Sequence, residues 1–387
     1  MVLRFVILIG VTNLFADLTY EGGRSITGPF LAQLGAGAAL ISIVSGTSEF
    51  LGYALRAVSG YVADRTGRRW TLVFVGYAIN MLAVPALALA GGWPAAATLM
   101  AAERTGRAIR RPVVQAMLSH AHTDVGGGRA FGINESLDAA GATLGPLVIA
   151  AVIAAGGGYR HGFAILLLSA LACLGMLVFT ERRYPNPAAF EGHDEDQGEG
   201  GTRRRPYPTS YWLYLAAAAL LGFGFVDFAL VAFHLQHTSV LKPALVPVAY
   251  AVAMGAGAVG NWVLGRAYDR FGLPVLLAAF AVGAAFPPMV FLAGSAWAFA
   301  GMALWGLNKG AQDTLLKPLL APLVPANARS TAFGLFDTAF GTAWLGGSVA
   351  LGLLYDRSLA TLVIVSVTTQ LLALPLFVLG HRARRSA

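Results

Sequence analysis

Charged residues are scarce in this chain. Only 12% of its 387 residues are Asp, Glu, Lys or Arg, whereas a soluble globular protein carries about 25%. Cysteine is nearly absent too, because Cys173 is the single one, which excludes an intramolecular disulfide. In contrast, 57% of the residues are hydrophobic and the mean hydropathy is +0.66. These figures exclude a soluble enzyme, a disordered chain and a disulfide-stapled secreted domain, and they leave a polytopic membrane protein.

Motifs for nucleotide and metal chemistry are also missing. We find no G-x-x-x-x-G-K-[ST] loop, no compact set of metal ligands and no nucleophile–base pair. We therefore expect no enzyme, no metal and no cofactor. The net charge of +8 would suggest nucleic acid in a soluble protein, but basic residues of a membrane protein gather in its cytoplasmic loops. We accordingly expect no nucleic-acid partner.

Apolar stretches of spanning length follow one another along the chain. A transmembrane helix needs roughly 20 apolar residues, and the pattern predicts twelve of them. The predicted spans are 4–29, 38–62, 70–91, 94–118, 129–155, 162–181, 210–236, 243–265, 273–293, 295–317, 329–354 and 359–380. The longest hydrophilic stretch contains EGHDEDQGEGGTRRR, which is typical of a flexible linker. The sequence thus predicts an all-α membrane protein with an N-terminal six-helix bundle (1–181), a cytoplasmic linker (182–208) and a C-terminal six-helix bundle (209–387).

The positions of Lys and Arg indicate the orientation. With both termini in the cytoplasm, most of the basic residues fall in inner segments, and the outer loops hold only Arg160, Lys242 and Arg357. This asymmetry is the positive-inside rule. It predicts a multi-pass protein of the cytoplasmic (inner) membrane with both termini inside.

Short segments of the first half recur in the second half in the same order. The sequence GYVADRTG at 60–67 returns as GRAYDRFG at 265–272, and Ala-Phe-Gly at 130–132 returns at 332–334. The same alignment places Arg107 on Lys309, and a similar offset places Asp17 on Asp227. Two six-helix repeats suggest a transporter whose substrate site lies between the pseudo-symmetric halves.

These residues resemble a known family. GYVADRTGRR at 60–69 closely resembles the signature of the loop between helices two and three in the major facilitator superfamily, and 265–272 is where that fold repeats it. GATLGP at 141–146 is similar to the helix-five motif of its antiporters, and ERTGRAIRRP at 103–112 resembles a group of bacterial and archaeal permeases of undefined substrate. The resemblance implies the twelve-helix facilitator fold; we expect a monomer.

The loop signature has a physical rationale as a conformational gate. Gly60 removes a side chain where two helices approach closely, and Asp64 at a helix end can accept from the N–H groups of a neighbouring helix start. We expect Asp64 to face 329–332 and Asp269 to face 129–131 when the cytoplasmic side is closed. The predicted gate residues are Gly60, Asp64, Arg65, Gly67, Arg68, Asp269, Arg270, Gly145 and Pro146.

Ionisable residues inside the spans predict the proton site. Asp17, Glu21 and Arg24 share one face of the first helix at spacings i, i+4 and i+7. A carboxylate in a cavity can hold a proton at neutral pH, because desolvation disfavours its charged form. We predict that Asp17 and Glu21 couple transport to protons, with Asp138 of helix five as a further candidate. In the alternative interpretation Arg24 simply neutralises Glu21.

Helix four carries the densest set of charges. Arg107 and its repeat partner Lys309 would suit an anionic or zwitterionic substrate if they face each other. In the alternative, Glu103, Asp138 and Asp313 neutralise them, and we favour neither. Next to them, Arg110 and Arg111 are expected to mark the cytoplasmic face. The predicted substrate-binding residues are Arg107, Lys309, Glu103, Arg104 and Asp227.

Other intramembrane positions are less informative. Helices three, six, nine and twelve lack internal charge, so we expect them to face lipid. His234 and His237 lie near the outer end of helix seven, and we expect both to be exposed. Asn80 and Trp305 are expected to pack inside the bundle rather than to contact a ligand.

The favoured hypothesis is a secondary active transporter that exports a small molecule in exchange for protons. Its expected partners are that substrate, protons and the lipid bilayer. One alternative is proton-coupled uptake of an organic anion through Arg107 and Lys309. A different class is a non-transporting membrane receptor or scaffold.

Overall fold

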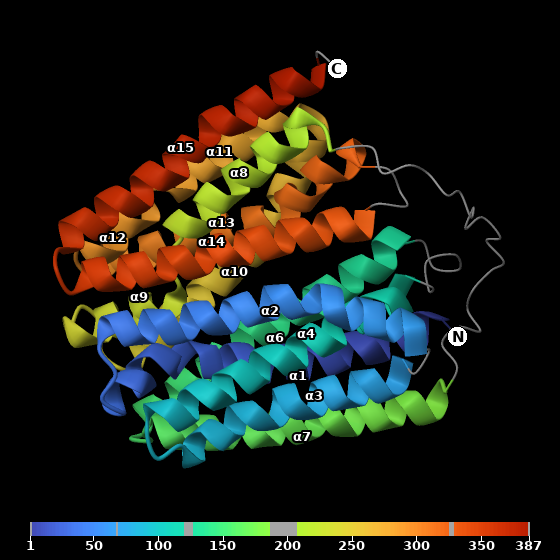
Figure 1. Ribbon diagram of the computed structural model, residues 1–387. Helices are drawn as coiled ribbons and strands as arrows, with labels where there is room; N and C mark the ends of the chain where they lie inside the picture. Colours follow the sequence, from blue (N-terminus) through green and yellow to red (C-terminus); the bar gives the residue numbers. More distant parts are fainter. Residues whose placement is uncertain (1, 67–68, 120–126, 186–206, 325–328, 386–387) are drawn as a thin grey trace.

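The computed structural model describes residues 2–66, 69–119, 127–185, 207–324 and 329–385, and these residues are almost entirely helical (Figure 1). The N-terminal helices are α1 (Val2–Gln33), α2 (Ala38–Thr66), α3 (Arg69–Ala86), α4 (Trp93–Ser119), α6 (Gly127–Ala154) and α7 (Tyr159–Arg183), with a short 3-10 turn η1 (Leu87–Leu89). The C-terminal helices are α8 (Thr209–Gly224), α9 (Phe228–His237), α10 (Leu245–Phe271), α11 (Leu273–Gly283), α12 (Phe286–Phe291), α13 (Ser295–Leu320), α14 (Arg329–Tyr355) and α15 (Leu359–Arg385), with η3 (Ala321–Leu323).

The predicted all-α architecture is confirmed. Within the described ranges, the helices form twelve segments when α8 with α9, and α11 with α12, are each counted as one interrupted span. Each segment overlaps one predicted span. Several helices run a few residues past the predicted ends, because polar residues continue the helix beyond its apolar part.

Two of the predicted spans are interrupted rather than continuous. The span predicted at 210–236 breaks after Gly224, and Asp227 caps the start of α9 by accepting a hydrogen bond from the backbone N–H of Ala229 at 2.9 Å. The span predicted at 273–293 breaks between α11 and α12, where Pro287 occupies the first turn of α12 and lacks a backbone N–H.

Ten segments in the described part of the chain are long and apolar enough to cross a membrane. The two segments outside this set are α4 and α13, which carry Arg107 and Lys309 respectively. The internal repeat aligns these same two residues. The two segments that fall short of a membrane span are therefore a symmetry-related pair, and charge within a span usually faces a cavity or a partner.

The helices pack in two groups that touch each other. Among the N-terminal helices, α1 packs against α6 and α7, and α4 packs against α2 and α3. Among the C-terminal helices, α8 packs against α14 and α15, and α10 packs against α13. The groups meet where α2 contacts α14, α1 contacts α9, and α6 contacts α10. Both chain termini lie at one end of the helices (Figure 1), which we call the terminal end.

The domain boundaries stay a prediction, because most of the predicted linker lies outside the described residues. The lipid-facing assignment also stays a prediction. Large apolar side chains such as Leu168 on α7, Val282 on α11 and Ile364 on α15 are exposed, as expected for such helices.

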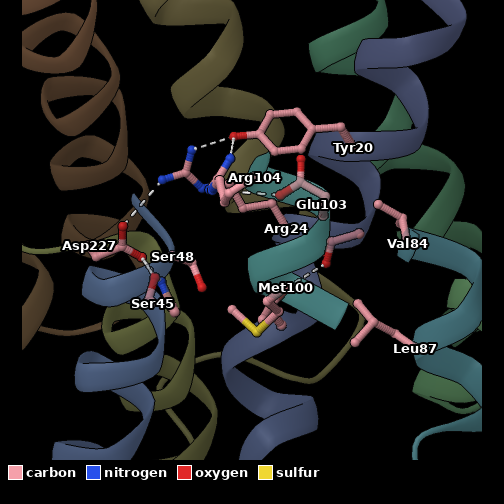
Figure 2. A pocket seen from close by; sticks show the side chains of 13 residues that line it. Tyr20, Arg24, Ser45, Ser48, Val84, Leu87, Met100, Glu103, Arg104 and Asp227 are labelled. Carbon is pink, nitrogen blue, oxygen red and sulfur yellow. Dashed lines mark hydrogen bonds and ion pairs between the residues drawn. The ribbon is translucent and has the colours of Figure 1, made fainter. Parts of the chain in front are cut away.

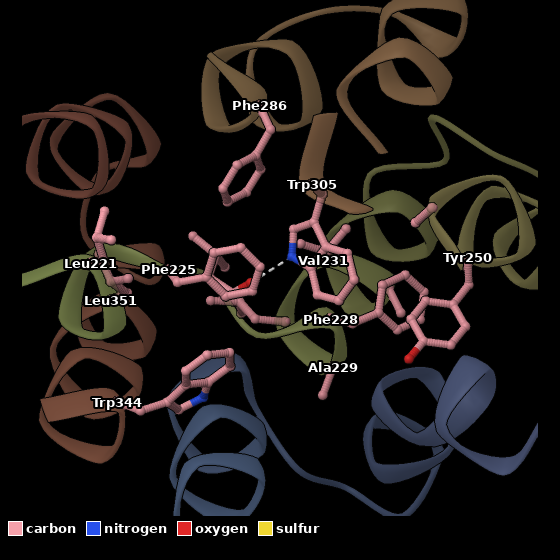
Figure 3. Close-up of a cluster of buried hydrophobic side chains, with 14 of the residues drawn as sticks. Leu221, Phe225, Phe228, Ala229, Val231, Tyr250, Phe286, Trp305, Trp344 and Leu351 are labelled. Atoms are coloured by element: carbon pink, nitrogen blue, oxygen red, sulfur yellow. Dashed lines mark hydrogen bonds between the residues drawn. The ribbon is translucent and has the colours of Figure 1, made fainter. Parts of the chain in front are cut away.

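A cluster of aromatic side chains fills the C-terminal group near the break between α8 and α9 (Figure 3). Phe225 packs against both Trp305 and Trp344. The indole N–H of Trp305 donates to the carbonyl oxygen of Val226 at 2.9 Å. This bond satisfies a carbonyl at the break, so Trp305 is a packing residue as expected.

Candidate functional site

Helices α1 and α4 form a ladder of ion pairs in the N-terminal group. The carboxylate of Asp17 lies 3.9 Å from the guanidinium of Arg110, and that of Glu21 lies 3.9 Å from the guanidinium of Arg107. The order is reversed along α4, because the two helices run antiparallel. A spacing of four residues on α1 therefore meets a spacing of three on α4.

The third step of the ladder recruits Glu49 from α2. Its carboxylate lies 2.8 Å from Arg24 and 2.6 Å from Arg104. The hydroxyl of Tyr20 accepts a hydrogen bond from each of the same two arginines. The alternative in which Arg24 neutralises Glu21 is wrong, because Arg24 binds Glu49 while Glu21 accepts from the hydroxyl of Tyr250 at 2.6 Å.

The ladder also connects the two groups of helices. Arg24 of α1 lies 3.2 Å from the carboxylate of Asp227 at the start of α9, and Ser45 of α2 donates to that carboxylate at 2.6 Å. Tyr250 of α10 binds Glu21 of α1, as described above. Asp227 also accepts from Ala229, so both of its oxygens already have partners. Its role in substrate binding stays a prediction.

A cavity lies beside the third step (Figure 2). Figure 2 shows Asp227, Ser45 and Ser48 on one side of it and Val84 and Leu87 on the other. The remaining lining residues are Tyr20, Gly23, Arg24, Thr27, Met100, Glu103, Arg104 and Ala229. The cavity therefore has one polar wall and one apolar wall.

Arg110 is buried inside this network, with 5% of its surface exposed. Its guanidinium donates to the amide oxygen of Asn80 at 3.1 Å and lies over the ring of Tyr77. Asn80 in turn donates to the carboxylate of Glu103 at 2.6 Å. The prediction that Arg110 marks the cytoplasmic face is therefore wrong, since these partners and Asp17 compensate its charge deep in the bundle. Asn80 packs internally as expected.

A chain of amides leads from Arg110 to Asp138. The side-chain oxygen of Asn13 accepts from Arg110 at 3.4 Å, and its amide donates to Asn134 at 3.0 Å. Asn134 donates to one oxygen of Asp138 at 3.3 Å. The other oxygen, Oδ1, is buried and has no hydrogen-bond partner among the described residues. Of the three predicted proton residues, Asp17 and Glu21 face cations, whereas Asp138 has a carboxyl oxygen with nothing to bind.

The two predicted substrate cations already have partners. The ammonium group of Lys309 lies 2.5 Å from the carboxylate of Asp313 one turn along α13. Arg107 pairs with Glu21, and its guanidinium lies 3.8 Å from the ring centroid of Tyr20. The alternative in which acidic residues neutralise these cations named Asp313 correctly as a partner, for Lys309. The partner of Arg107 is Glu21, however, and not Glu103 or Asp138.

The predicted gate is only partly visible. Gly67 and Arg68 lie outside the described residues, as do the surroundings of Gly60 and the side chains of Asp64 and Arg65. Asp269 and Arg270 are exposed at the end of α10. A Cβ atom at Gly145 would overlap the carbonyl oxygen of Leu18, so this glycine lets α6 approach α1 closely, and the adjacent Pro146 is buried. A gating role for any of them stays a prediction.

Several participants could not be found from charge patterns. The residues Tyr20, Asn13, Ser45 and Tyr250 are neutral, and the one available signal is that Asn13 precedes Asp17 by one helical turn.

His234 is buried, with 2% of its surface exposed, and bonds the hydroxyl of Tyr355 at 3.0 Å, so the prediction that it is exposed is wrong. Within the described ranges, no three His, Cys, Asp or Glu residues gather as a metal would require.

Comparisons with known proteins place the chain among transporters. A family model described as Major Facilitator Superfamily matches residues 14–348. An uncharacterized protein of Mycobacterium tuberculosis is 38% identical over 374 residues, which cover 96% of this chain and 91% of the relative. An uncharacterized MFS-type transporter of Methanocaldococcus jannaschii is 23% identical over 369 residues, which cover 91% and 89% of the two chains.

Solved structures share the fold at low sequence identity. A bacterial homolog of the human lysosomal transporter Spinster, in an inward-facing and occupied conformation, matches with a TM-score of 0.76 and 16% identity over 98% of this chain and 97% of that one. A peptide transporter, POT, in complex with sulfate matches with a TM-score of 0.78 and 16% identity over 99% and 94%.

Proposed function

Since the chain belongs to the Major Facilitator Superfamily, we propose that it is a secondary active transporter that moves a small molecule across the cytoplasmic membrane by alternating access. Family and fold support membrane transport by a multi-pass membrane protein rather than catalysis. The ladder supports alternating access, because bonds such as Arg24–Asp227 and Tyr250–Glu21 join the two groups of helices. Such bonds can break when the groups move apart and re-form when they close.

The positive-inside prediction places the terminal end in the cytoplasm. The contacts of Arg24 and Ser45 with Asp227 then hold the outer halves of α1 and α2 against α9. Nearby, a Cβ atom at Gly28 would overlap the carbonyl oxygen of Ala229, so no space remains between α1 and α9. We infer that this conformation is closed toward the outside.

We propose that Asp138 carries the coupled proton, and the observation that supports this is its buried, unpartnered oxygen. A proton on that oxygen would remove the buried negative charge, which burial disfavours far more than a neutral polar group. On release of the proton, the anionic Asp138 would compete for Asn134 and, through Asn13, for Arg110. Charged groups around Asp138 include Asp17 on α1, Glu135 on its own helix, and Arg110 and Arg111 on α4. Loosening Arg110 from Asp17 would change how α1, α4 and α6 pack.

Export in exchange for protons remains the proposed direction, on the antiporter-like Gly145–Pro146 motif. Uptake of an organic anion has less support, because Lys309 and Arg107 already have carboxylate partners. A receptor or scaffold on the same fold would bind a ligand without moving it.

The direction can be measured in proteoliposomes that contain a trapped pH dye. External addition of each member of a small-molecule library should alkalinise the lumen if the substrate enters in exchange for protons, whereas symport should acidify it. The sign is independent of how the protein inserts. A compound that binds the purified protein but gives neither pH change nor counterflow would favour the receptor class.

The variant Asp138→Asn tests the coupling residue. It should abolish the substrate-induced pH signal while retaining counterflow of labelled substrate, since exchange needs no net proton movement. Asp356→Asn, in an exposed position between α14 and α15, is the matched control and should keep both activities. An undiminished pH signal in the Asp138 variant would remove this residue from the mechanism.

A further inference from the structure

Two charged side chains on the terminal side of the ladder have no partner among the residues that the structure describes. Arg111 on α4 and Glu135 on α6 are both exposed. In the part of the chain that the structure describes, neither makes a hydrogen bond or an ion pair. An ionised side chain on a membrane-spanning helix is costly in lipid and normally faces water or a partner. We infer from their exposure that both residues face an aqueous space.

The two side chains border the same space. Arg110 and Asn134, the residues that immediately precede them, both bond Asn13, at 3.4 and 3.0 Å. This shared partner brings α4 and α6 together at the level of Arg111 and Glu135. The two charges interact electrostatically, yet no ion pair joins them, so a gap separates the guanidinium from the carboxylate.

A second acidic group reaches the space from α13. The side chain of Asp313 is 58% exposed although Lys309 holds it at 2.5 Å, and it interacts electrostatically with both Arg111 and Glu135. On the α4 side, Arg107 and Arg56 lie near Arg111 and add positive charge. The space therefore has a cationic side at α2 and α4 and acidic groups from α6 and α13.

We propose that Arg111 and Glu135 bind the two ends of a small zwitterionic substrate, an amino acid or a longer amino carboxylate. Arg111 can hold the carboxylate in a bidentate fork, and Glu135 can accept from the ammonium group, with Asp313 beside it. A simple anion would meet the uncompensated charge of Glu135, and a simple cation that of Arg111. This proposal rests on the proposed transport function, for which it names the substrate class.

The test is a ligand-stability series on the purified full-length protein. The probes are linear ω-amino carboxylates from glycine to 6-aminohexanoate, with the carboxylate and the amine of each chain length. A ligand that binds the folded state raises the melting temperature according to its concentration and Kd. The best zwitterion should bind at least about tenfold more tightly than either analogue with one charge removed, since a hydrogen bond to a charged group supplies roughly that factor.

Two variants separate the two contacts. Arg111→Ala should bind the zwitterion and its amine analogue equally, whereas Glu135→Gln should bind the zwitterion and its carboxylate analogue equally. Arg111→Lys keeps the charge but cannot form the bidentate fork. Its affinity for the zwitterion should therefore lie between those of the wild type and Arg111→Ala. Arg357→Ala, in an exposed position between α14 and α15, is the control and should bind as the wild type does. Melting temperatures without ligand verify that each variant folds.

Several results would overturn the proposal. One is tight binding of the carboxylates alone, and another is equal binding of zwitterions, carboxylates and amines. A third is that either variant loses binding of all three probe classes, and the last is that no probe binds. Failure of the transport function is a separate outcome, because the melting series needs no flux. Zwitterions that bind without a pH signal in proteoliposomes would contradict proton coupling and leave the binding site intact.

Discussion

At the scale of single residues, the third step of the ladder depends on a carboxylate that serves two cations at once. This residue is Glu49, because Arg24 and Arg104 both lie within 2.8 Å of it. Burying a charge costs several kcal/mol unless a partner and further hydrogen bonds compensate it. Without Glu49, the two guanidinium groups would share little more than the hydroxyl of Tyr20 at this step.

We therefore expect Glu49→Gln to lower the free energy of unfolding by about 3 kcal/mol, the magnitude typical of breaking a buried ion pair. Gln keeps the volume and one acceptor, so the loss reports the charge. Thermal or denaturant unfolding in detergent measures it, with Asp356→Asn as the exposed carboxylate that should change stability by less than about 0.5 kcal/mol. Equal stabilities of the two variants would show that the ladder contributes no net stability.

The partners within the ladder could not be read from the sequence, although its members could. Spacings of four on α1 and three on α4 correctly placed Asp17 with Glu21, and Arg107 with Arg110, on shared faces. The choice of partner depends on how the helices rotate and how far a long side chain reaches. Arg24 crosses to Glu49 and Asp227 rather than to Glu21 one turn below it, and no local spacing contains that information.

At the scale of the helix, small residues set the distances between axes. Gly145 and Gly141 on α6 face the carbonyl oxygens of Leu18 and Leu14 on α1, and a Cβ atom at either position would overlap them. Close approach through small residues is the usual means of packing helices in a membrane, where no hydrophobic effect drives association. The antiporter-like motif therefore has a packing role in this chain whatever its part in gating.

Gly145→Ala should consequently destabilise the protein, because α6 and α1 must separate to admit the methyl group. The matched control is Gly175→Ala on α7, where a Cβ atom meets no other atom within 4 Å. That variant should be neutral or gain up to about 1 kcal/mol, since Ala favours helix over Gly. The melting temperature of Gly145→Ala should therefore fall, whereas that of Gly175→Ala should stay the same or rise. A small rise in both variants would contradict tight packing at Gly145.

The positions of the helices were largely predictable, but their interruptions were not predicted. Twenty or so apolar residues specify a span whatever surrounds it, and ten of the twelve segments in the described ranges meet that criterion, whereas α4 and α13 do not. The break at Asp227 was missed because α8 and α9 are both apolar and merge into one hydrophobic stretch. Asp before an apolar run is nevertheless an N-cap signal, and here it coincides with an ion pair from another helix.

At the scale of the whole molecule, Asp227 couples a local feature to the relative position of the two groups of helices. Its carboxylate caps α9 and at the same time receives Arg24 and Ser45 from α1 and α2. Separation of the outer halves would break the bonds to Arg24 and Ser45 and keep the cap. Asp227 thus makes two kinds of bond. The cap of α9 persists in every state, whereas the contacts with Arg24 and Ser45 must break and re-form during alternating access.

A cysteine at Ser348 can report that reversibility. Ser348 is buried on α14 and lies against Gly46 of α2, and the single native cysteine, Cys173, is buried as well. A membrane-impermeant maleimide added from outside should label Ser348→Cys slowly, because the outer side is closed. Adding Asp227→Ala should speed labelling about tenfold for each 1.4 kcal/mol lost from the closed state. Asp227→Asn should fall between, since its oxygen can still accept from Ala229 and Ser45. Equal rates in all three backgrounds would mean that other contacts, such as those between α2 and α14, keep the outer side closed without Asp227.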